Sequence, residues 1–194
     1  MKNAPIKTRS QLDRRDWIEL ATHVLADQGL DGLRVEVLAK QFGVTKGSFY
    51  WHFKDRQDLL TAVLDTWKDG RIRDIIKQTT AQPGKERDQI YHVIDVYSAA
   101  RSRKGVSIEL AVREWARRDA HAAAIVAEVD NCRLENARRL FEEYGLPEGE
   151  AKARSLLLYA YVFGQSLMIY DRFDPSPASL RTWIADHIVR AEDR

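Results

Sequence analysis

Apolar residues recur every three or four positions along nearly the whole chain, which is the spacing of amphipathic helices. Pro and Gly number only 5 and 10 in 194 residues, so long helices are possible and a sheet-rich fold is disfavoured. The pattern therefore predicts an all-α protein of about nine helices. The expected helices cover about 13–28, 35–42, 46–52, 55–76, 90–97, 108–115, 119–144, 148–172 and 177–188, with a basic turn at 101–105.

Two short predicted helices near the N-terminus, 35–42 and 46–52, are separated by about three residues. The first carries the small residue Ala39 where the second helix must cross closely. Gly43 opens the turn, where glycine adopts a positive φ easily, and Thr45 is expected to cap the second helix. This is the spacing of a DNA-binding helix-turn-helix, whose second helix enters the major groove.

The second of these helices combines a buried face with polar groups suited to DNA. Tyr and Trp on a short helix are usually core residues, but Phe49 and Phe53 already fill the inner face at i, i+4 spacing. Tyr50 and Trp51 are therefore expected to point away from the core. Gly47 leaves room where the helix start must approach a duplex. Residues suited to phosphates are Tyr50, His52 and Lys54, and those suited to base edges or a thymine methyl are Lys46, Ser48 and Trp51.

The run from Gly43 to Lys54, followed by Leu59 and Leu60, resembles the tetracycline-repressor (TetR) family of bacterial regulators. The resemblance covers about residues 13–64. It implies an N-terminal three-helix DNA-binding domain, residues 1–54, and a C-terminal helical domain for ligand binding and dimerisation, residues 55–194. It also implies a repressor that binds a palindromic operator as a homodimer and is released by a small-molecule inducer. The implied DNA-contacting residues are Arg34, Thr45, Lys46, Gly47, Ser48, Tyr50, Trp51, His52 and Lys54.

The chain departs from the family pattern just before the second helix. Family members usually have Ser or Thr there, which caps the helix and touches phosphate, whereas this chain has Leu33, Arg34 and Val35. Arg34 can still reach a phosphate, but we expect the capping hydrogen bond to be absent.

Residues 156–170 are apolar on almost every side but too few for a membrane span, which needs about 20 residues. A helix this apolar must be covered on more than one side. A partner subunit is the simplest cover, so we expect a homodimer through helices near 148–172 and 176–192. The alternative is a helix buried deeply within one chain.

A ligand pocket in the C-terminal domain is indicated by aromatic residues, and an aromatic lining favours a flat or apolar ligand. Arg113, Glu114 or Gln165 can orient such a ligand. For every candidate the alternative is ordinary core packing or exposure at the surface. The candidate lining residues are Trp67, Tyr91, Tyr97, Trp115, Tyr161, Phe163, Gln165 and Met168.

Charge and cysteine content change this picture little. The net charge is only +2, although residues 1–54 hold nine Lys or Arg against six Asp or Glu. The three basic residues before Asp13 form either a phosphate-binding arm or a solvated tail. The single cysteine, Cys132, favours a reducing compartment, and the first residues lack the apolar core of a signal peptide. We therefore expect a cytoplasmic, nucleoid-associated protein.

Enzyme chemistry has no support in the sequence. The five histidines are scattered without metal-ligand spacing, and no phosphate-binding glycine loop or nucleophile elbow occurs. We therefore predict no catalytic activity, no metal and no cofactor. The alternative to an inducible repressor is a ligand-independent DNA-binding regulator, or an activator, of the same fold.

Overall fold

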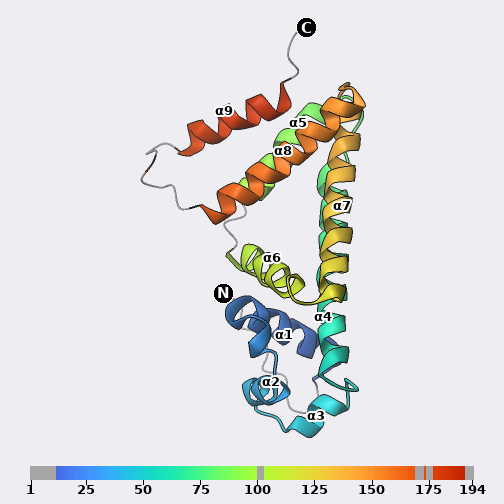
Figure 1. Ribbon diagram of the computed structural model, residues 1–194, viewed down its shortest axis with the longest axis vertical. Coiled ribbons are helices and arrows are strands. Elements are labelled where there is room, and N and C mark those ends of the chain that lie inside the picture. The colour runs from blue at the N-terminus through green and yellow to red at the C-terminus, as the bar shows by residue number, and fades with distance from the viewer. Residues whose placement is uncertain (1–11, 100–102, 169–172, 174–176, 191–194) are drawn as a thin grey trace. The chain divides into compact units, whose positions relative to one another are not determined.

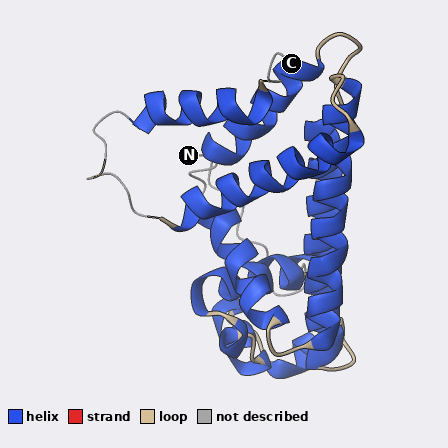
Figure 2. Ribbon diagram, turned by 45° about the horizontal axis from the view of Figure 1, so that its top comes forward, coloured by secondary structure: helices blue, strands red, loops and turns tan. Residues whose placement is uncertain are grey.

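The computed structural model describes residues 12–99, 103–168, 173 and 177–190. These ranges contain nine α-helices and one 3₁₀ helix but no strand (Figures 1 and 2), which confirms the all-α prediction. None of the described helices combines the length and the hydropathy that a membrane span requires. The elements are α1 (Arg14–Gln28), η2 (Leu30–Gly32), α2 (Val35–Phe42), α3 (Lys46–Tyr50), α4 (Arg56–Thr79), α5 (Glu86–Ala99), α6 (Arg103–Ala116), α7 (Ala120–Glu143), α8 (Glu148–Leu167) and α9 (Pro177–Val189).

The chain forms two compact units. The first unit consists of residues 1–69 and 104–126, and the second unit consists of residues 70–103 and 127–194. The first unit thus includes the first part of α4 together with α6, in addition to the helix-turn-helix. The functional boundary expected after residue 54 remains a prediction.

The first unit is built around Trp17 of α1, which is fully buried. Its ring meets the ring of Phe42 edge-on with centroids 5.0 Å apart, and that of Phe49 at 5.5 Å. The start of α1 is fixed by a capping box. The side chain of Asp13 accepts a hydrogen bond from the backbone N–H of Asp16, and the side chain of Asp16 accepts one from the backbone N–H of Asp13. This core holds α2 and α3 on α1.

The second unit has its own apolar core, which α5, α7, α8 and α9 build. A hydrogen bond of 2.6 Å from the Tyr91 hydroxyl to Asp186 joins α5 to α9. Arg154 of α8 donates to the carbonyl of Ile188 at 2.7 Å and so holds the end of α9. The largest members of this core are Ile90, Ile94, Leu140, Phe141, Leu146, Leu158, Tyr159 and Ile188.

Two predicted boundaries were wrong. Residues 103–105, predicted as part of a basic turn, are helical and begin α6. A single glycine disfavours a helix by only about 1 kcal/mol relative to alanine, so Gly105 does not break it. The helix predicted to reach residue 172 ends at Leu167, and Met168 is extended with φ −93° and ψ 142°. Residues 101–102, 169–172, Ser176 and the basic arm before Asp13 lie outside the described residues.

Candidate nucleic-acid interface

The turn between α2 and α3 depends on Gly43. This residue adopts φ 65° and ψ 30°, a left-handed conformation that glycine adopts without steric penalty. Its N–H donates to the carbonyl of Lys40 at 3.1 Å, and the N–H of Val44 donates to that of Ala39 at 2.9 Å. These are the two bonds of a Schellman motif. The chain therefore leaves α2 in a fixed direction and enters α3 after the three residues 43–45, as predicted.

Helix α3 separates its aromatic residues between core and solvent. Phe49 and Phe53 are buried, and their rings stack with centroids 5.2 Å apart. Tyr50 is 58% exposed and Trp51, in the turn that follows, is 87% exposed. The prediction that Tyr50 and Trp51 point away from the core is confirmed. An almost fully exposed indole is available for contact with another molecule.

All nine predicted DNA-contacting residues lie in the first unit, within residues 34–54. Ser48 and His52 are half-buried and the other seven are exposed. Their role as DNA contacts remains a prediction.

The caps of α2 and α3 differ from ordinary helix starts. Thr45 occupies the N-cap position of α3, but its side chain makes no capping hydrogen bond, which corrects the predicted cap. The hydroxyl does not reach a free N–H of the short helix; the carbonyl of Thr45 instead accepts from Ser48 at 3.1 Å. Arg34 occupies the N-cap of α2, also without a side-chain bond, as expected.

Lys46 is held by an ion pair that sequence reasoning did not find. Its ammonium nitrogen lies 2.7 Å from a carboxylate oxygen of Glu36 in α2. The shared hydrogen bond lowers the pKa of Glu36 and raises the pKa of Lys46. Both side chains are more than half exposed, so the pair is screened by water and opens easily to a competing anion.

A second contact missed from the sequence fixes the end of α3. Arg14 donates to the carbonyl of His52 at 2.7 Å and to the carboxylate of Asp58 at 2.8 Å. Its guanidinium lies 4.2 Å from the centre of the Phe53 ring. Asp58 also accepts from the backbone N–H of Lys54 at 3.0 Å. The hydrogen bond from Arg14 and then that from Lys54 hold the pKa of Asp58 below its ordinary value. Arg14 and Asp58 thus clamp the segment that carries His52 and Lys54.

The candidate ligand residues are divided between the two units. Trp67 and Trp115 belong to the first unit, and Trp115 lines a cavity next to η2. The other six belong to the second unit, where Tyr97 and Phe163 contact the buried ring of Tyr159, with centroids at 5.8 and 6.4 Å. Such contacts also occur in ordinary cores, so a ligand role for these residues stays a prediction. Within the described ranges, no three His, Cys, Asp or Glu side chains gather as metal ligands would.

Comparison with known proteins agrees with this geometry. Residues 18–63 match the model of the family described as "Bacterial regulatory proteins, tetR family". The HTH-type transcriptional regulator AcrR of Shigella flexneri is 35% identical over 57 residues, which are 29% of this chain and 26% of AcrR. The chain therefore matches only about a quarter of the length of that relative.

Solved structures extend the likeness in fold along the chain. A transcriptional regulator from Rhodococcus sp. Rha1 has a TM-score of 0.69 with 21% identity, over 91% of this chain and 94% of that one. BioQ, solved with its double-stranded DNA operator, has a TM-score of 0.51 with 23% identity, over 92% of this chain and 99% of BioQ. Residues 18–63, which contain the helix-turn-helix, are thus similar to the tetR family of bacterial regulatory proteins, and the rest of the chain shares the all-helical fold of these solved structures.

Proposed function

We propose that the protein is a transcription regulator that binds a palindromic DNA operator as a homodimer, with α3 as the reading helix. The observation that carries the proposal is the exposure of Tyr50 in α3 and of Trp51 just after it, while Phe49 anchors the helix from inside. Lys46 and Lys54, at the two ends of this segment, are also exposed. Exposed aromatic and basic groups in one short segment suit the bases and phosphates of a major groove. BioQ, which shares the fold, was solved with a DNA operator.

The dimer is supported by apolar side chains that α8 and α9 leave exposed. Leu156 and Leu157 of α8 are 61% and 51% exposed, and Trp183 of α9 is 62% exposed. Apolar surface of this kind is typical of a protein interface. A twofold dimer presents two reading helices, and helix-turn-helix dimers recognise half-sites about 34–36 Å apart. The proposed interface is formed by residues near 148–172 and 176–192.

Release by a small molecule and the repressor role are proposed from the family. A ligand that binds better to the conformation unable to bind DNA shifts the population toward it. The proposed pocket lies in the second unit, among residues such as Tyr97, Tyr161 and Phe163. The proposed function is regulatory rather than catalytic, and it places the protein on DNA in the nucleoid.

The test is a selection of bound duplexes from a random DNA pool with the purified full-length protein. We expect enrichment of a palindrome whose half-sites lie about one helical turn apart. Trp51→Ala is expected to abolish the enrichment while leaving the helical content of the protein unchanged in circular dichroism. A protein with no affinity for DNA even at low salt contradicts the proposed function.

A further inference from the structure

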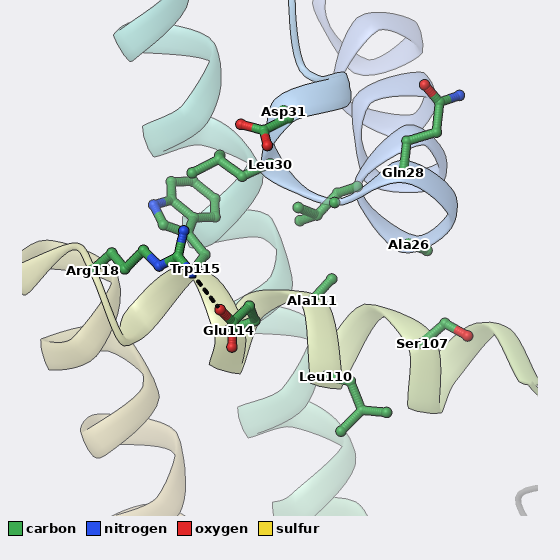
Figure 3. A pocket seen from close by; sticks show the side chains of 12 residues that line it. Ala26, Gln28, Leu30, Asp31, Ser107, Leu110, Ala111, Glu114, Trp115 and Arg118 are labelled. Carbon is green, nitrogen blue, oxygen red and sulfur yellow. Dashed lines mark ion pairs between the residues drawn. The ribbon is translucent and has the colours of Figure 1, made fainter.

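A cavity of about 560 Å³ lies inside the first unit, between the end of α1, η2 and α6 (Figure 3). Its apolar lining comes from Leu25 of α1, Leu30 of η2, and Leu110, Ala111 and Trp115 of α6. Leu25 and Trp115 are almost fully buried, whereas Leu110 is 40% exposed. The volume falls within the roughly 300–1,000 Å³ typical of small-molecule sites. The cavity thus combines a fixed apolar floor with an accessible entrance.

The charged side chains that line this cavity are two acidic ones, Asp31 and Glu114, and one basic one, Arg118. Glu114 of α6 pairs with Arg118, with 3.5 Å between their charged atoms, as the dashed line in Figure 3 marks, and also with Arg117 at 3.6 Å. Asp31 of η2 is exposed and makes no ion pair with any residue that the structure describes. Helix α1 ends at the same wall with no basic residue in its last turn, so its terminal carbonyls contribute further partial negative charge.

We propose that this cavity is a second ligand site, which takes an amphipathic organic cation. The flat apolar part of the ligand lies against Leu30, Leu110 and Trp115, and its ammonium group pairs with Asp31. Of the lining charges, that of Asp31 has no ion-pair partner among the described residues, so it is the charge that a cationic ligand can meet without breaking an existing pair. The site is separate from the aromatic pocket proposed in the second unit, because all of its lining residues belong to the first unit.

The wall of the cavity is tied to the start of α4 and, through α1, to the helix-turn-helix. Arg56 of α4 donates to the carbonyl of Leu30 at 3.2 Å and to that of Leu33 at 2.5 Å. Leu25 belongs to the same buried stripe of α1 as Trp17, which contacts α2 and α3. A ligand on Leu25 and Leu30 therefore touches the segments that position the reading helix. Coupling between ligand binding and DNA binding rests on the proposed function. Such coupling must be reciprocal, so a factor by which DNA changes the affinity for the ligand is also the factor by which the ligand changes the affinity for DNA.

The binding test needs no DNA, so its failure is distinguishable from failure of the proposed function. The probe is monodansylcadaverine, whose fluorescence responds to an apolar environment and whose amine is cationic. The matched probe is dansyl-6-aminohexanoic acid, which has the same aromatic group and nearly the same chain but a carboxylate. We expect full-length protein to bind the cationic probe at least about tenfold more tightly than the anionic one.

Two variants locate the site. Asp31→Asn removes the charge and is expected to weaken binding of the cationic probe by about fivefold, the usual size of a partly exposed ion pair. Ala111→Leu fills the cavity from α6 and is expected to weaken binding of both probes. The control is Asp27→Asn, which also removes one negative charge. Asp27 lies near the end of α1 and does not line the cavity.

The proposal is supported if the cationic probe is preferred and both cavity variants weaken its binding while the control does not. It is overturned if the anionic probe binds as well as the cationic one, or if the wild-type protein binds neither. It is also overturned if Asp31→Asn and Ala111→Leu retain wild-type affinity, because the probe then binds elsewhere. Circular dichroism of each variant confirms that the comparison is made between folded proteins.

Discussion

The fold does not require a glycine at position 47. A Cβ at this position would lie 3.5 Å from the hydroxyl oxygen of Thr45, which is an ordinary van der Waals contact. Alanine is favoured over glycine in helices by about 0.5–1 kcal/mol. We therefore expect Gly47→Ala to raise the free energy of unfolding, measured in urea, by about 0.5 kcal/mol. We also expect it to weaken operator binding, measured by fluorescence anisotropy, about tenfold, because the added methyl group meets the duplex.

The matched control for this change is Gly70→Ala. Gly70 lies in the middle of α4, and a Cβ there meets nothing within 4 Å. We expect a similar gain in stability with operator affinity unchanged. Equal operator affinity of Gly47→Ala and wild-type protein would show that α3 does not approach DNA at this residue.

Lys54 and Lys46 are expected to act on different parts of the duplex. Removing a lysine that contacts phosphate reduces the slope of log affinity against log salt by about 1 per contact. We expect Lys54→Ala to weaken binding to every duplex and to reduce this slope, and Lys46→Ala to change the preferred sequence instead. Measurements at several salt concentrations, with an operator and a scrambled duplex, separate the two. Lys77→Ala, an exposed cation of α4, serves as the control and should leave both properties unchanged.

At the scale of the elements, the clamp of Arg14 on Asp58 joins α1 to the end of α3 and the start of α4. Because the pKa of Asp58 is lowered in the folded state, its contribution to stability is present above the unfolded pKa of about 3.9 and is lost as the pH falls through the folded pKa. We expect Asp58→Asn to lower the free energy of unfolding by about 1 kcal/mol at pH 7. The difference from wild type should shrink between pH 4 and pH 2.

Urea unfolding at pH 7, 4 and 3 measures this difference. Asp74→Asn is the control, since Asp74 pairs with Arg71 within a single helix and at the surface. That variant is expected to remain within about 0.5 kcal/mol of wild type at pH 7. A difference for Asp58→Asn that grows as the pH falls would contradict the clamp.

The elements also show what the sequence could and could not predict. The bounds of α2 were predicted correctly because apolar periodicity and Gly43 mark both its faces and its end. The exposure of Trp51 followed from Phe49 and Phe53 filling the inner face. The pair of Arg14 with Asp58 spans 44 residues, so no local pattern contains it. For the same reason the cavity between η2 and α6 could not be predicted, since its walls are remote in sequence.

At the scale of the whole molecule, the proposed function requires a dimer that places two reading helices on one operator. The exposed Trp183, which stacks on His187 at 3.6 Å between ring centroids, is the largest apolar side chain available on α9. Truncating a tryptophan buried at an interface costs about 2 kcal/mol or more. We therefore expect Trp183→Ala to raise the dimer dissociation constant at least about thirtyfold, as measured by sedimentation equilibrium.

Operator binding should fall with the dimer, because a monomer engages only one half-site and loses the second set of contacts. Ile76→Ala provides the control, since Ile76 is also a large apolar side chain, 48% exposed, but lies on α4 outside the proposed interface. We expect that variant to keep both its dimer and its operator affinity. If Trp183→Ala remains a dimer at concentrations where wild type does, the interface does not use the exposed face of α9. If it becomes monomeric and still binds the operator with wild-type affinity, the regulator does not read its site as a symmetric pair.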